Sequence, residues 1–508
     1  LVLLLADGMS PSMVTAARMI GHKIINGKYQ TQLALDKPDG FGIQMTSSLD
    51  SIITDSANSA SAIMGGMKTT VNALNVYTDS TGLPFGPKFE TTFEMARRIY
   101  GAQIGVVSTA YLADASPAAT VTHTSHRNAY DYIIDQYLDG NNGSWFPWDG
   151  LDVLFGGGGS DFLPKASNGN VSKIDRWQER GYEFVTTNTS LHEIGNDGRA
   201  LGLFSASTMP TWLDRHVFKQ NLEDKFGAYD PVNKTFTAPT TDSPGLKEMT
   251  IKALDILSTR AKKNDVPFLL FSEAASIDKA MHVGDMERAM GEILELDDTV
   301  KATLDHLKKL DLMDDTLVVV TSDHAHGFDV FGSVDTVYMQ SQSTNAGKRR
   351  AIGTYRESGL SGYQVRPEDN PQNQTVVAHD GFPATWSPRY TAAWGFAATV
   401  DKYDNFEVHN STRKTSVEND DGSYSANEAD SPGGFLDTGN LPVTDDQGVH
   451  SLSDVLIFSW GPGSDKFRGV LNSIDIAHNI GHALNLGRDK NVTYTKKSPS
   501  PSRGKVHL

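Results

Sequence analysis

Acidic and histidine side chains follow three apolar segments of this sequence. Asp7 follows "LVLLLA", Glu273 follows "PFLLFS", and Asp323 and His324 come after "TLVVVT" and one serine. Each segment has the length and the apolar composition of a buried parallel strand. Because ligands bind beyond the carboxyl ends of parallel strands, these side chains are expected to meet in one crevice.

Asp278 and His282 extend this group, since they lie four residues apart in "EAASIDKAMH" and one helical face would carry both. Taken alone, each feature also has an ordinary explanation. An Asp–Gly pair after a strand is commonly a turn, and an Asp–His pair can be a cap beside a satisfied histidine. An acid and a histidine one turn apart can form a solvated helix face. Their joint occurrence favours a site for divalent cations, which carboxylate and imidazole bind well.

A hydroxyl and an acid, Ser56 and Asp55, begin a run of small and apolar residues in "TDSANSASAIMGG". The β-branched residues before them suggest that a strand hands over to a helix at this point. Ser56 is then either an ordinary cap or a nucleophile at a helix N-terminus, where N–H groups and the helix dipole favour an anion. This stretch alone leaves both interpretations open.

The composition excludes several functions. The chain has 508 residues, a formal net charge of −17 and no cysteine. The acidity argues against nucleic acid or an anionic membrane as the main partner. The lack of cysteine rules out disulfide scaffolds, thiol catalysis and Cys-ligated zinc sites. No apolar run approaches about 18 residues, so no transmembrane segment is predicted.

Short apolar segments alternate with helical patterns, which predicts an α/β fold with a mostly parallel sheet. The predicted strands are 1–6, 104–109, 151–156, 267–272, 316–321 and 454–459, and the predicted helices are 244–263, 285–310 and 473–486. Between residues 327 and 447 the sequence becomes rich in Gly, Ser, Asn, Asp and Thr. We interpret 327–447 as an inserted cap on a discontinuous catalytic domain of residues 1–326 and 448–508.

Several motifs resemble those of the alkaline phosphatase family, in the order in which the family has them. They are "DGM", "TDSANSASA", "DASPAATVTHTSHR", "EAASIDKAMH", "TSDHAH" and a late histidine before "DVLIF", and they span almost the whole chain. The resemblance implies a three-layer α/β/α sandwich with a crown-like insertion, and hydrolysis of phosphate monoesters through a phosphoserine at Ser56. It also implies two Zn²⁺ and one Mg²⁺. Asp55, which has no ligand role in this scheme, is assigned to capping.

The resemblance implies a ligand set for each metal, carried over by motif. Asp278, His282 and His450 are expected to hold the first zinc. Asp7, Asp323 and His324 are expected to hold the second, together with the Ser56 hydroxyl. Asp7, Ser116 and Glu273 are expected to hold magnesium. Imidazole and carboxylate suit zinc, and an all-oxygen site suits magnesium.

His450 departs most from the family pattern, because the family usually has a glycine soon after this histidine and this chain reads "HSLSDVLIF". His326, His379 and His409 are the alternatives. His450 is preferred because a predicted strand follows it.

Arg127, in "THTSHRNAY", matches the arginine with which the family clamps phosphate, and a guanidinium can donate two parallel hydrogen bonds to phosphate. Asp114 and Lys279 form a combination that resembles bacterial members, and Lys279 would help to neutralise bound phosphate. The alternatives are a salt-bridge arginine and a surface lysine.

Two other functions fit the same fold. A phosphodiesterase of the superfamily generally lacks the arginine clamp and the ligands of the third metal, whereas Arg127, Ser116 and Glu273 are present here. A non-catalytic phosphate- or glycan-binding relative should have lost one of Ser56, His282 or Asp323.

The sequence also bears on localisation and assembly. We interpret "LVLLLA" as a buried strand and not as a signal peptide. Seven N-x-[ST] sequons favour a secreted, periplasmic or lumenal protein. A homodimer is expected from the resemblance alone.

Overall fold

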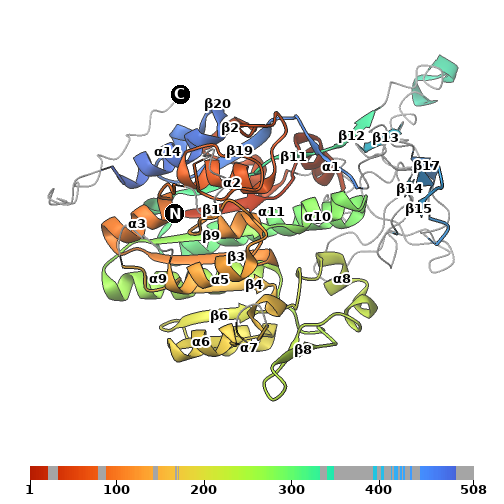
Figure 1. The fold of residues 1–508 in the computed structure, drawn as a ribbon. Helices are drawn as coiled ribbons and strands as arrows, with labels where there is room; N and C mark the ends of the chain where they lie inside the picture. The colour runs from red at the N-terminus through yellow and green to blue at the C-terminus, as the bar shows by residue number, and fades with distance from the viewer. Residues whose placement is uncertain are drawn as a thin grey trace, which may run out of the picture.

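A ten-stranded sheet forms the centre of the computed structural model (Figure 1). Its strands lie in the order β20 (Gly469–Asn472), β2 (Gly40–Met45), β19 (Val455–Trp460), β10 (Val318–Thr321), β1 (Val2–Ala6), β9 (Phe268–Ala274), β3 (Gln103–Tyr111), β4 (Val153–Gly157), β6 (Arg199–Leu203) and β5 (Tyr182–Val185). Only β19 is antiparallel to its neighbours in this sheet. The predicted α/β fold with a large, mostly parallel sheet is therefore confirmed.

The structure describes residues 1–20, 32–77, 87–140, 147–165, 169, 171–331, 340–347 and 447–487, with short pieces between 393 and 437. Most of the predicted cap, including His379 and His409, lies outside these residues. So do five of the seven sequons.

The central strand β1 shows why helices must cover both faces of the sheet. Its side chains point alternately to opposite sides, so Leu4 joins one buried apolar cluster and Leu3 and Leu5 join the other. The first cluster includes helices α1 (Pro11–Ile20), α9 (Leu246–Asn264) and α11 (Met286–Lys309). The second includes α2 (Ser56–Gly65), α3 (Thr92–Tyr100), α5 (Tyr130–Asp139) and α14 (Ser473–Leu484). The result is the predicted three-layer sandwich.

All six predicted strands and all three predicted helices are present, with ends that differ by a few residues. Four strands of the sheet, β2, β5, β6 and β20, were not predicted. In β2, glycines interrupt the apolar pattern, because Gly40 and Gly42 lie against the carbonyl oxygens of Ser464 and Phe467 and leave no room for a Cβ. In the described part of the chain, no helix is both long enough and apolar enough to cross a membrane.

Candidate active site

The register of the sheet brings the strand-end residues together. Leu5 of β1 pairs with Thr321 of β10 on one side and with Glu273 of β9 on the other. Asp7 and Asp323 therefore leave the sheet at the same edge, where the Gly8 amide donates to Asp323 Oδ1 at 3.2 Å.

A left-handed turn at Gly8 (φ +73°) allows helix α10 (Ser276–His282) to approach this edge. A Cβ at Gly8 would lie 3.0 Å from the Cβ of Asp278. Glycine is needed here for the turn and for the close contact. The Asp7–Gly8 pair therefore forms a turn, and this turn also positions candidate metal ligands.

Ser56 is the first residue of α2, and Asp55 caps this helix by accepting a hydrogen bond from the Asn58 amide at 3.1 Å. The assignment of Asp55 to capping is confirmed. Ser56 is buried, and its Oγ lies 3.2 Å from Nε2 of His324. The residues before Asp55 form no strand, since β2 ends at Met45, so the expected strand-to-helix handover was wrong.

Asp278 is the centre of the first group of candidate ligands. Nε2 of His282 lies 3.2 Å from Asp278 Oδ2, and Nε2 of His450 lies 3.3 Å from Oδ1. His326 approaches the same Oδ1 at 3.6 Å. These four residues form a cluster whose ligand atoms lie within 4.8 Å of one another.

Hydrogen bonds to the backbone distinguish His282 and His450 from their neighbour His326. Nδ1 of His282 lies 2.7 Å from the carbonyl oxygen of Gly448, and Nδ1 of His450 lies 2.8 Å from that of Thr54. A carbonyl oxygen only accepts, so both Nδ1 atoms carry the proton, and in the neutral rings both Nε2 lone pairs are free for a metal.

In His326 the pattern is reversed, because Nδ1 accepts a hydrogen bond from the next backbone amide at 3.0 Å. A neutral His326 therefore has its proton on Nε2, where it faces Asp278. This tautomer leaves no free lone pair on the nitrogen that faces Asp278, so His326 is less suited than His282 or His450 to ligate a metal there.

A second group surrounds His324. Its Nε2 lies 3.3 Å from Asp7 Oδ1 and 3.3 Å from Asp323 Oδ2, in addition to its contact with Ser56. Burial, followed by the charge of neighbouring His450, keeps the pKa of His324 well below its ordinary value. The imidazole is therefore neutral, as metal ligation requires. The rings of His324 and His450 stack with centroids 3.5 Å apart, so the two groups adjoin.

Ser116 and Glu273 are both buried beside this edge. Glu273 Oε2 accepts a hydrogen bond from Ser108 at 2.5 Å, while the Ser116 hydroxyl has no hydrogen-bond partner. Burial, with a further effect of Asp114, raises the pKa of Glu273 to about 8. Ser108 was missed in the sequence, because a serine inside an apolar strand gives no signal of its partner.

The buried polar atoms of the two groups fit divalent cations. Burial, together with Asp323, Asp278 and Glu273, raises the pKa of Asp7 well above its ordinary value. Burial and Asp278 likewise raise the pKa of Asp323 to about 6. A cation would remove both penalties. The buried atoms without a hydrogen-bond partner include Asp7 Oδ1, Ser116 Oγ, Asp278 Oδ1, Asp323 Oδ2 and His324 Nδ1.

Asp114 forms ion pairs with two cationic side chains. Its Oδ2 accepts from Lys279 Nζ at 2.6 Å and its Oδ1 from Arg127 Nη2 at 2.8 Å. Burial alone would raise the pKa of Asp114, but Lys279 and Arg127 lower it well below its ordinary range. Tyr111, whose ring centroid lies 5.1 Å from Lys279 Nζ, was not anticipated from the sequence.

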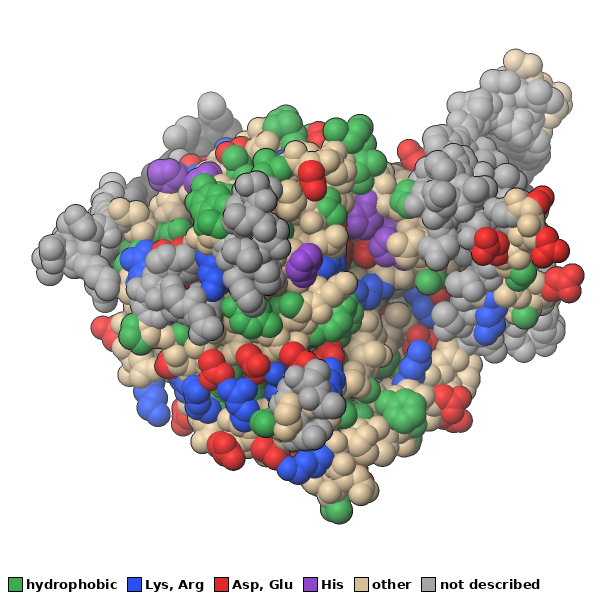
Figure 2. Space-filling model, in the orientation of Figure 1, with side chains coloured by type: hydrophobic (Ala, Val, Ile, Leu, Met, Phe, Trp, Pro, Cys, Tyr) green, Lys and Arg blue, Asp and Glu red, His purple; other side chains and the backbone are tan. Residues whose placement is uncertain are grey.

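A cavity of about 520 Å³ opens onto these groups. Figure 2 shows histidine side chains on this face, with acidic and basic side chains beside them. The cavity is lined by Ile53, Ser56, Arg127, Asp278, His282, Gln447, Val449 and His450. Ser56, Arg127 and the first ligand group therefore face one space.

Comparison with known proteins shows the family. The family model described as alkaline phosphatase matches residues 1–486. The chain belongs to the alkaline phosphatase family. It is 34% identical to the alkaline phosphatase of Escherichia coli over 355 residues, which covers 64% of this chain and 70% of that one. It is 26% identical to alkaline phosphatase 4 of Bacillus subtilis over 499 residues, covering 96% of this chain and 89% of the other. The protein is a phosphatase enzyme, and its family implies divalent metals.

Solved structures of the family have the same fold. The alkaline phosphatase of Thermus thermophilus superposes with a TM-score of 0.62 at 21% identity, covering 96% of this chain and 91% of that one. At this identity the likeness concerns the fold alone.

Proposed function

We propose that this alkaline phosphatase hydrolyses phosphate monoesters through a covalent phosphoserine at Ser56. The observation that carries the proposal is the place of Ser56, which lies at the N-terminus of α2 with its Oγ 3.2 Å from His324 Nε2. A helix N-terminus offers unpaired N–H groups and a positive dipole end to an arriving phosphoryl group. The phosphate therefore reaches the nucleophile at a place where the helix N-terminus already provides a positive electrostatic potential.

We further propose that the two groups of ligands hold two zinc ions and that Ser116 and Glu273, with Asp7, hold magnesium. The free Nε2 lone pairs of His282 and His450 support the first zinc site. His324, Asp7 and Asp323 form the second. When bound, the metals supply positive charge and lower the pKa of hydroxyl groups that they coordinate.

The remaining residues position and neutralise the phosphate. Arg127 lies in the same cavity as Ser56 and can donate two hydrogen bonds to phosphate oxygens. Its pairing with Asp114 at 2.8 Å and with Asp55 at 3.4 Å fixes the guanidinium before substrate arrives. Lys279, bonded to the other oxygen of Asp114, adds positive charge behind it. Preorganised charge of this kind stabilises a phosphoryl-transfer transition state.

The other described residues in the wall of the cavity are Ile53, Gln447 and Val449. None of these three carries a charge, so a leaving group that is apolar suits this wall better than one that is anionic. Aryl phosphates are therefore the substrates of choice for a first assay.

The test is a paired measurement of kcat/KM near about pH 9 for an aryl phosphate monoester and the matching diester, before and after treatment with EDTA. We expect a strong monoester preference, loss of turnover on chelation, and recovery with zinc and magnesium together. Ser56→Ala should lower kcat by about 10³-fold or more, because a nucleophile acts as a unit with its activating groups.

Thr54→Ser, next to the cap, is the matched control and should retain activity, since the contact to His450 uses only its backbone carbonyl. Diester preference would contradict the assigned roles of Arg127 and the magnesium ligands. Metal binding without turnover of either ester would support the binding-protein alternative.

A further inference from the structure

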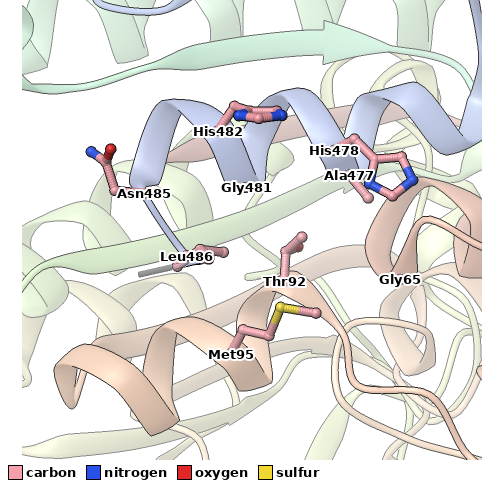
Figure 3. Close-up of a pocket in the computed structure, with 10 residues that line it drawn as sticks. Gly65, Thr92, Met95, Ala477, His478, Gly481, His482, Asn485 and Leu486 are labelled. Carbon is pink, nitrogen blue, oxygen red and sulfur yellow. The ribbon is translucent and has the colours of Figure 1, made fainter. Parts of the chain in front are cut away.

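A second cavity, of about 440 Å³, lies at the opposite end of α2 from Ser56. It is bounded by α14, by α3 and by Gly65, the last residue of α2, and Figure 3 shows the side chains that line it. A helix of ten residues is about 15 Å long, so this cavity is well separated from the nucleophile. None of the groups discussed above lines it.

Two histidines of α14, His478 and His482, line this cavity and are both exposed. They lie four residues apart, so their Cβ atoms are neighbours on one face of the helix (Figure 3). In the described part of the chain neither imidazole has a hydrogen-bond or ion-pair partner. Other histidines of the described chain, such as His123 and His306, are hydrogen-bonded to acids. This pair is therefore free to take a ligand.

The ends of two helices make the cavity favourable for a cation. His482 lies in the last turn of α14. The ring of His478 lies against Gly66, the C-terminal cap of α2, within 3.2 Å of the position that a Cβ would occupy. The C-terminal end of a helix carries partial negative charge, so a positive ion is stabilised there.

The chemistry of the pair selects the ion. Imidazole nitrogen binds Cu²⁺, Ni²⁺ and Zn²⁺ in preference to Mg²⁺ or Ca²⁺, which take oxygen ligands. Two imidazoles one turn apart form a helical chelate, as in metal sites in which i and i+4 histidines share a face. Asn485 and water are available to complete the coordination. Among the described residues that line the cavity there is no carboxylate, so the affinity should be lower than that of the catalytic edge.

We propose that His478 and His482 form a binding site for one divalent transition-metal ion, distinct from the catalytic metals. The ion would join α14 to the end of the helix that carries Ser56. The proposal does not depend on the proposed catalytic mechanism.

The test is titration of Ni²⁺ into enzyme already loaded with zinc and magnesium, followed by calorimetry. We expect one additional site in the wild type. His478→Ala and His482→Ala should each weaken binding by at least about 10-fold, because loss of either ligand removes the gain from chelation. His192→Ala is the matched control, since His192 is a single exposed histidine in the last turn of α7 (Asn188–Glu193).

Two further readouts separate a chelate from independent surface histidines. Independent histidines would lose about half of the bound ions in each single variant, whereas a chelate loses nearly all in both. His482→Gln should keep the kcat of the wild type while losing the extra Ni²⁺. Equal Ni²⁺ binding by the wild type and both alanine variants, or an equal loss in His192→Ala, would overturn the proposal.

Discussion

Two buried clusters of acids in this molecule are balanced in different ways. On helix α11, Arg288 bonds to Asp285 at 2.9 Å and to Asp214 at 2.8 Å, and Arg215 bonds to Glu295 at 2.5 Å. At the catalytic edge, Asp7 and Asp323 are equally buried, but both lie against the neutral imidazole of His324, and Asp278 adds negative charge beside them.

The difference separates a structural cluster from a functional one. A buried carboxylate needs a compensating charge, because its ionised form is poorly solvated inside a protein. On α11 the chain supplies arginines, which pair with Asp214, Asp285 and Glu295. At the catalytic edge it supplies only part of the charge, which leaves the site able to bind cations and, through them, an anionic substrate.

The largest expected effect is at the catalytic edge. Asp323→Asn should lower kcat/KM by about 10³-fold, as expected when a group that acts only with its neighbours is lost. In metal-free enzyme at pH 8 the same change should raise the free energy of unfolding, because it removes a carboxylate whose ionised form is unfavourable there. Chemical denaturation of the wild type and the variant, with and without metals, measures the sign of the change in unfolding free energy in each state. Destabilisation in both states would show that Asp323 is already balanced by the protein.

For a substitution in the α11 cluster, the sign of the change in unfolding free energy should not depend on bound metals. Arg215→Met should lower the free energy of unfolding by about 3–5 kcal/mol with or without zinc, because it leaves Glu295 buried without its partner. Denaturant unfolding of both forms checks this, and kcat of the folded fraction should be unchanged. Arg176→Met is the control, since its ion pairs with Asp135 and Asp139 are partly exposed to solvent. If the loss of unfolding free energy in Arg215→Met depended on bound metals, the distinction between the two clusters would be contradicted.

Arg127 combines features of the α11 cluster and of the catalytic edge. It forms an ion pair with Asp114, and it is also expected to bind the phosphate of the substrate. Arg127→Ala should lower kcat/KM by about 10- to 100-fold, mainly through a higher KM, as two charge-assisted hydrogen bonds to phosphate are lost. Steady-state kinetics and inhibition by inorganic phosphate measure this. An unchanged KM would mean that Arg127 serves only its ion pair with Asp114.

The α11 cluster should also give a pH dependence. Burial, with the charge of Glu295, raises the pKa of Glu292 to about 8 from its ordinary 4.5. Between these two values the folded state binds more protons than the unfolded state, so stability falls as pH rises, by at most about 1.4 kcal/mol per pH unit for this group.

Glu292→Gln should therefore flatten the fall in unfolding free energy between pH 5 and 8. Glutamine can still accept the hydrogen bond from the Trp212 amide. Urea unfolding at four pH values across this window measures the slope. Parallel curves for both proteins would show that Glu292 is ionised in the fold.

The smallest effect concerns the cavity wall. Ile53→Ser should lower kcat/KM for an aryl phosphate by a few-fold, about the value of two methylene groups in partial contact, and leave that for glycerol phosphate unchanged. The ratio of the two substrates is the measurement. Equal changes for both would indicate that Ile53 acts through the segment before Ser56 and not through the leaving group.

The strand-end residues Asp7, Glu273, Asp323 and His324 could be predicted because an apolar run fixes a buried strand and the parallel arrangement fixes which end carries the ligands. Asp55 could be assigned as a cap because capping depends on neighbouring residues alone. By contrast, β2 could not be predicted, since its glycines are explained only by a strand and a turn that lie far away in the sequence.

The sequence by itself determined the fold class, the family and most of the candidate ligands, because these depend on local periodicity and on short motifs. The sequence favoured His450 over His326 only through the strand that follows it, and the tertiary structure supplied the physical distinction between them. The two residues pair with each other across short strands β11 (Ala325–His326) and β18 (His450–Ser451), so both reach Asp278. The distinction depends on which nitrogen each backbone neighbour engages, and the neighbour of His450 is the carbonyl of Thr54, almost four hundred residues away in sequence. Packing decides that contact, and no local pattern encodes it.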